Sequence, residues 1–179
     1  MLFAASLLLK ALAIPLLARI AWLDFITQKI SNQNVLLLLC MGLGSLLLSS
    51  VQSGSWWDLG LSVLAGLLLF VVFFPFWTLR KVGAGDVKLM AVVPLLIGGS
   101  DLIVFSALLL VFALATALIV KNPFMLPAGM FRVYVQHLDR KGVVPFGVPI
   151  ALAAICSIGF QMYESWLLAT SSGVLQQLS

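Results

Sequence analysis

The sequence predicts an all-α integral membrane protein, a polytopic bundle of about six transmembrane helices with its N-terminus outside, in a single domain over residues 1–179. Of these residues, 63% are hydrophobic and only 9% are charged, whereas a soluble domain of this length needs far more charged surface. The hydrophobic residues form six runs, most of them near the roughly 20 residues that cross a bilayer. The segments between the runs alternate in their content of Lys and Arg, which sets the orientation.

The first three runs are each expected to form a spanning helix. The first, Leu2 to Leu23, superficially resembles a signal peptide. However, Lys10 and Arg19 interrupt it and no basic residue precedes it, so we interpret it as a span. The next two, Val35 to Val51 and Leu59 to Leu79, contain no charged residue and approach the bilayer thickness at a rise of about 1.5 Å per residue.

The fourth run is the shortest of the six. Val87 to Gly98 contains Lys88 and Pro94, and we expect either a short helix shielded by its neighbours or a re-entrant segment. The fifth and sixth runs, Leu102 to Val120 and Val143 to Ala169, are long enough to span.

The basic residues orient the predicted bundle, because cytoplasmic loops are enriched in Lys and Arg. With the N-terminus outside, Ser53 to Asp58 and Gly99 to Asp101 are external and hold neither residue type. Asp24 to Asn34, Arg80 to Asp86 and Lys121 to Gly142 are cytoplasmic. These three segments carry Lys29, Arg80, Lys81, Lys121, Arg132, Arg140 and Lys141.

Two features are not explained by this alternation. Lys10 lies inside the first run, near its outer end, and we expect it to snorkel or to face the bundle interior. The loop from Lys121 to Gly142 is long and partly apolar, so we expect it to contain an interfacial helix.

The lipid bilayer is an expected partner, whereas nucleic acid, metal ions and cofactors are not expected. The net charge of +4 comes from basic residues spread over short loops rather than gathered on one face. Cys40 and Cys156 match no metal or redox spacing, and we expect them to be small core residues. His137 is the single histidine, and a metal site needs several convergent donors.

Two aspartates stand at the polar ends of apolar runs: Asp24, and Asp86 in the step Gly83-Ala84-Gly85-Asp86. Each alone has a structural interpretation, Asp86 as a helix N-cap after two turn glycines and Asp24 as a charge at the headgroup region. However, carboxylates near hydrocarbon are costly and tend to mark function, and the predicted topology places both at the cytoplasmic boundary. In the functional interpretation, Gly83 and Gly85 let the backbone pass close to a bound peptide.

Two such carboxyl groups can catalyse peptide hydrolysis. When they lie close together they resist double ionisation and share one proton. The ionised group takes a proton from water, which attacks a peptide carbonyl, and the protonated group donates to the carbonyl oxygen. This reaction requires neither a metal nor a nucleophilic side chain.

Three segments of the sequence resemble those of the type IV prepilin peptidases. Trp22 to Asn32 (WLDFITQKISN) is similar to their first-aspartate segment, and Gly83 to Ala91 (GAGDVKLMA) is similar to their Gly-x-Gly-Asp motif with its Val-Lys-Leu continuation. Val144 to Ala153 (VPFGVPIALA) resembles the Pro-Phe-Gly-Pro-type start of their last helix. The three segments occur in the family's order and span most of the chain.

The resemblance implies an intramembrane aspartyl endopeptidase of the bacterial inner membrane. Such enzymes remove the basic leader from prepilins or pseudopilins at the cytoplasmic face. It further implies Asp24 and Asp86 as the catalytic pair, Gly83 and Gly85 as loop-shaping residues, no cofactor, and an indirect role for Lys88.

The sequence departs from the family's larger members. Those bifunctional enzymes carry an N-terminal insertion with two Cys-x-x-C pairs and also N-methylate the product, and this chain lacks that insertion. The resemblance therefore implies the short branch that serves Flp/Tad-type pili, with cleavage and no methylation. Ser31 also stands where many relatives have proline.

Two other classes of function remain open. A small transporter or a proton or cation relay would also use membrane-edge aspartates, although a permeation path usually has polar groups through the membrane depth. A non-catalytic assembly subunit would use Asp86 only as a cap. A relative of presenilin-like proteases would be a variant of the peptidase, because it shares the paired-aspartate chemistry.

Overall fold

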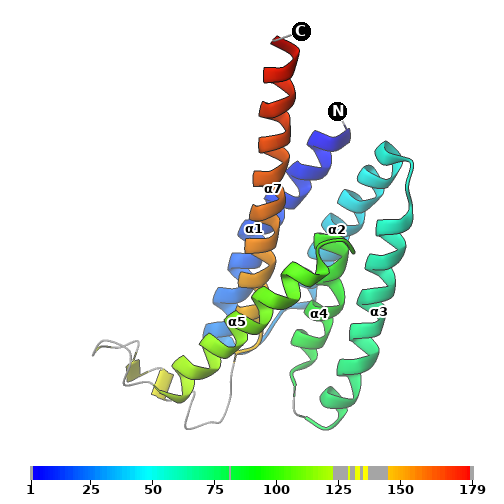
Figure 1. The fold of residues 1–179 in the computed structure, drawn as a ribbon. Coiled ribbons are helices and arrows are strands. Elements are labelled where there is room, and N and C mark those ends of the chain that lie inside the picture. Colours follow the sequence, from blue (N-terminus) through cyan, green and yellow to red (C-terminus); the bar gives the residue numbers. More distant parts are fainter. Residues whose placement is uncertain are drawn as a thin grey trace.

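The computed structural model describes residues 2–80, 82–122, 129, 132–133, 135–136 and 145–177. The main helices within these residues form a bundle (Figure 1). They are α1 (Leu2–Thr27), α2 (Asn32–Ser53), α3 (Trp57–Thr78), α4 (Ala84–Ile97), α5 (Leu102–Lys121) and α7 (Gly147–Gln177). All but α4 are long and apolar enough to cross a membrane. The predicted all-α membrane fold, with one helix for each apolar run, is confirmed.

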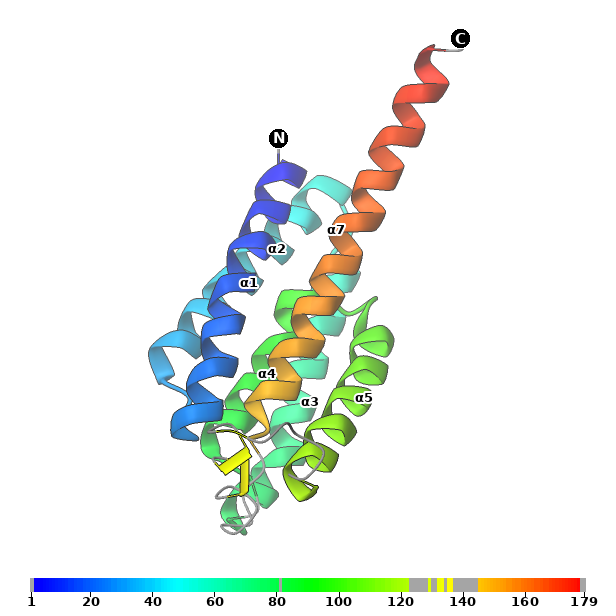
Figure 2. The ribbon, with the colours of Figure 1, turned by 90° about the vertical axis from the view of Figure 1, so that its left-hand side faces the viewer.

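The short helix α4 lies at the centre of the bundle. It has 14 residues, of which nine are buried, and it packs against α2, α3 and α7. In Figures 1 and 2 the turn between α4 and α5 lies well below the N-terminal end of α1, so α4 covers only part of the bundle's height. The expected short helix shielded by its neighbours is therefore observed.

Glycines on the neighbouring helices allow α4 to lie this deep. A Cβ atom added at Gly42 of α2 would lie 2.9 Å from the carbonyl carbon of Leu95, and one added at Gly66 of α3 would lie 2.5 Å from the carbonyl oxygen of Ala91. Both distances are shorter than real side chains tolerate. Small residues permit this kind of backbone approach between membrane helices, where dispersion contacts rather than water exclusion hold the helices together.

The outer helices direct large apolar side chains away from the bundle. In α3, for example, Val63, Leu64, Leu67, Leu68 and Val71 are exposed, as expected for a surface that faces lipid. Cys40 and Cys156 are also exposed, so their prediction as core residues is wrong; each lies on an outward face of its helix. The interfacial helix expected between Lys121 and Gly142, and His137, fall largely or wholly outside the described residues.

Candidate active site

Asp24 lies on the inward face of α1, where it meets the beginning of α7. Its residue is only 4% exposed, and its Oδ2 atom accepts a 2.8 Å hydrogen bond from the backbone N–H of Gly147. The backbone N–H of Val148 is a second donor. These are among the first N–H groups of α7, which lack partners within the helix and carry the positive end of its dipole. The start of α7 is therefore a site built for a carboxylate.

Gly147 fits this site only because it has no side chain. A Cβ atom there would lie 2.7 Å from Oδ2 and 2.8 Å from Cγ of Asp24. Sequence analysis placed this glycine at the start of the last helix but gave it no role. The signal was present in the Pro145-Phe146-Gly147 step, yet a single sequence cannot show that a carboxylate 123 residues earlier packs against it.

Asp86 lies in the first turn of α4. The N-cap of this helix is Gly83, so the expectation that Asp86 is itself the N-cap is wrong. Instead the carboxylate reaches back and accepts a hydrogen bond from the backbone N–H of Gly83, as the third residue of a capping box does. Its Oδ1 atom is buried and has no hydrogen-bond partner among the described residues. A buried acceptor left unpaired in this way is costly and calls for a functional explanation.

Both aspartates line one cavity of about 320 Å³, together with Gln28, Lys29, Ile30 and residues 83–85. The structure thus brings together all four of the predicted site residues, from the end of α1 and the start of α4. Gln28 and Ile30, which sequence analysis did not single out, complete the wall. Gln28 follows the last residue of α1 in a left-handed conformation (φ 54°), which ends the helix and leads into Lys29 and Ile30.

The two motif glycines provide space rather than unusual backbone angles. Gly83 precedes α4 with φ −68°, and Gly85 lies within α4 and is not among the residues with positive φ, so neither position requires the conformational freedom of glycine. A Cβ atom on Gly83 would lie 2.9 Å from Oδ2 of Asp86, and one on Gly85 would lie 2.8 Å from Cβ of Ile30. Gly85 therefore lets the α1–α2 loop approach α4, which brings the two aspartate-bearing segments together.

Contacts around the cavity fix that loop. Ser31 is the N-cap of α2, and its hydroxyl accepts a hydrogen bond from the N–H of Asn34. Lys88 of α4 donates a 2.9 Å hydrogen bond to Oδ1 of Asn32. Lys88 therefore joins α4 to the start of α2 without lining the cavity, consistent with the indirect role implied for it.

The electrostatics of the cavity favour the protonated form of Asp86. Burial, and secondly the neighbouring Asp24 carboxylate, raise the pKa of Asp86 to about 7, although the hydrogen bond from Gly83 acts in the opposite direction. Near neutral pH a large fraction of Asp86 is therefore protonated and able to donate, beside a second carboxyl group. This is the arrangement that general acid–base catalysis requires. Among the described residues, no group of three or more His, Cys, Asp or Glu side chains is placed to hold a metal ion.

Comparison with known proteins gives one match. Residues 11–121 match the model of the type IV leader peptidase family. This range contains both aspartates and both motif glycines and covers more than half of the chain. Searches of curated proteins and of solved structures found no match.

Proposed function

This chain belongs to the type IV leader peptidase family, whose members are aspartic prepilin peptidases, and from that premise we propose that Asp24 and Asp86 are its catalytic pair. The observation that carries the proposal is the cavity that both carboxylates line. Each carboxylate also lies against a glycine, Asp24 against Gly147 and Asp86 against Gly83. A Cβ atom added at either glycine would displace the carboxylate.

The hydrogen bonds of the two carboxylates support a division of roles. Asp24 accepts N–H bonds from two residues at the start of α7, whereas Asp86 accepts one, from Gly83. Hydrogen bonds to the charged form stabilise it, so the shared proton resides on Asp86. Asp24 is then the base that takes a proton from the attacking water. Asp86 is the acid that donates to the carbonyl oxygen of the scissile peptide.

The substrate is the basic leader of a prepilin or pseudopilin, cleaved at the cytoplasmic membrane face of a bacterial inner membrane. The positions of the basic residues support this placement, because the cavity lies at the end of the bundle that carries Lys29, Arg80 and Lys88. We further propose cleavage without N-methylation, as in the branch that serves Flp/Tad-type pili. Supporting this, the two cysteines lie on separate helices and form no Cys-x-x-C pair.

The test is leader processing in cells that co-express a prepilin. Asp24→Asn and Asp86→Asn should each abolish cleavage while the protein still inserts, because an amide is not able to exchange the shared proton. Glu164→Gln is the matched control, since it makes the same chemical change at an exposed carboxylate of α7. Normal processing by either Asp variant would refute the pair. If the Asp variants lost an ion flux but still processed the prepilin leader, the result would instead favour a transporter.

A further inference from the structure

Helix α4 ends at a residue that is buried in the bundle. The last four carbonyl oxygens of any α-helix have no partner within the helix, and at membrane depth such groups need partners from the protein or from a water-filled cavity. Helix α4 ends at Ile97, whose residue is 1% exposed. Its end is followed by Gly98, with φ 101°, and by the turn to α5.

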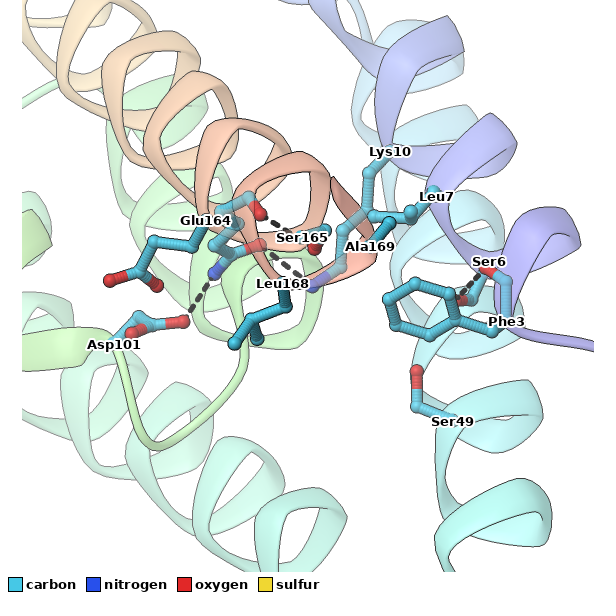
Figure 3. A pocket seen from close by; sticks show the side chains of 11 residues that line it. Phe3, Ser6, Leu7, Lys10, Ser49, Asp101, Glu164, Ser165, Leu168 and Ala169 are labelled. Carbon is cyan, nitrogen blue, oxygen red and sulfur yellow. Dashed lines mark hydrogen bonds between the residues drawn. The ribbon is translucent and has the colours of Figure 1, made fainter. Parts of the chain in front are cut away.

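Two side chains from other helices satisfy this end. The carbonyl oxygen of Ile97 accepts a 2.7 Å hydrogen bond from Nε2 of Gln161 on α7 and a 3.3 Å hydrogen bond from Nζ of Lys10 on α1. Lys10 also donates to Oε1 of Gln161 at 2.8 Å, and Gln161 donates to Oδ2 of Asp101 at 2.6 Å. Figure 3 shows Lys10 and Asp101 converging on α7 from opposite sides.

The turn is held from a third helix as well. Oδ1 of Asp58, in the first turn of α3, accepts a 2.9 Å hydrogen bond from the N–H of Ser100. A lysine next to the end of a helix also complements the negative end of its dipole. We call Lys10, Gln161, Asp101 and Asp58 the α4 cap. It explains Lys10, which the predicted topology did not place: the side chain faces the bundle interior.

We infer that Lys10 and Gln161 are positioning residues for the reaction, because the α4 cap fixes the height of α4 in the bundle and thereby the position of Asp86. The buried residues along the sides of α4 are apolar, and apolar contacts are non-directional. Near its first turn, α4 is also held by the hydrogen bond from Lys88 to Asn32. Hydrogen bonds to one carbonyl oxygen are directional. Asp86 lies eleven residues before Ile97, about 16 Å along the same helix, so a shift at the cap moves the carboxylate away from Asp24.

The experiment compares purified full-length variants in lipid bilayers and rests on the proposed role of Asp86. Lys10→Met should lower kcat about 100-fold, the cost of misplacing a reacting group by about 1 Å, and leave KM nearly unchanged. Gln161→Met should also lower kcat and leave KM nearly unchanged. This second variant keeps the inference testable if Lys10→Met does not fold. Lys10→Arg keeps the charge and donors and should restore most of kcat. Glu164 lines the cavity drawn in Figure 3 together with Lys10 and Asp101, away from the cavity of the two aspartates, and does not belong to the α4 cap. Glu164→Gln should therefore match the unmodified protein.

A second readout does not involve catalysis. Lys88 and Asn32 lie within hydrogen-bond distance, so Asn32→Cys with Lys88→Cys should be joined by a short bis-maleimide when Cys40 and Cys156 are replaced. Lys10→Met should reduce the cross-linking yield, and Lys10→Arg should restore it. Unchanged kcat in folded Lys10→Met would overturn the inference, as would a loss of kcat at full cross-linking yield. If Asp86→Asn remains active, the proposed function fails. The cross-linking yield still shows whether the α4 cap fixes the position of α4.

Discussion

At the scale of single residues, the site depends on glycines, because it has no room for a side chain at three positions. Gly83, Gly85 and Gly147 each occupy a place where a methyl group would collide with a carboxylate or with Ile30. In the proposed function the aspartates supply the chemistry, and the glycines leave room for both aspartates to line one cavity. A substitution at such a glycine is therefore expected to change the position of a reacting group rather than the fold.

Gly147→Ala tests this view. The new Cβ atom would lie 2.7 Å from Oδ2 of Asp24, so the carboxylate must shift, and we expect cleavage to slow about 100-fold. Gly159→Ala is the matched control on the same helix, since a Cβ atom there has no atom within 4 Å among the contacts described, and it should retain full activity. Equal rates for both variants, measured on purified protein, would contradict the role given to Gly147.

The pH dependence of cleavage follows from Asp86. With a pKa of about 7, it is protonated below neutral pH and loses its proton as the pH rises, which removes the general acid. We therefore expect kcat/KM to fall above pH 7, approaching tenfold per pH unit. The profile should be the same for Glu164→Gln. A rate that stays constant up to pH 9 would show that a protonated Asp86 is not required.

At the scale of elements, α4 connects the cavity with the opposite part of the bundle. It is too short to be one of the five helices that could cross a membrane, and its neighbours satisfy both its sides and its end. The apolar run and its low length were visible in the sequence. The donors that compensate for its early end, Lys10 and Gln161, were not predictable, because they come from α1 and α7, 87 and 64 residues away in the chain.

The close packing of α3 on α4 gives a prediction about stability. A Cβ atom at Gly66 would lie 2.5 Å from the carbonyl oxygen of Ala91, whereas Gly60 on the same helix has open space. Gly66→Ala should lower stability by about 1–3 kcal/mol, the usual cost of overpacking, and Gly60→Ala should not. Thermal unfolding in detergent measures the difference. An unchanged unfolding midpoint for Gly66→Ala would contradict the close packing of α3 against α4.

At the scale of the whole molecule, hydropathy predicted one helix per run, because lipid permits few backbone arrangements other than a helix. Sequence order and the charge pattern also predicted which helix ends would share a side, and hence that Asp24 and Asp86 would be neighbours. The N-cap assignment of Asp86 and the burial of the cysteines were wrong, since both depend on which face of a helix meets a neighbour. No single sequence specifies that rotation.

The predicted orientation is open to a labelling experiment. Ser55, in the loop between α2 and α3, and Gln33, in the first turn of α2, are both exposed and lie at opposite ends of α2. With Cys40 and Cys156 replaced, Ser55→Cys should react with a membrane-impermeant maleimide in intact cells, and Gln33→Cys only after permeabilisation, because basic loops are cytoplasmic. The reverse pattern would place the cavity on the external face and contradict cleavage at the cytoplasmic side.

The central claim is that two carboxyl groups, one from α1 and one from α4, share a proton and together hydrolyse a leader peptide. The most direct measurement is single-turnover cleavage of a prepilin by purified Asp24→Asn and Asp86→Asn protein in bilayers, beside Glu164→Gln. The predicted result is no detectable product from either Asp variant, both correctly folded, and an unchanged rate from the control. Product formed at the unmodified rate by either Asp variant would contradict the claim.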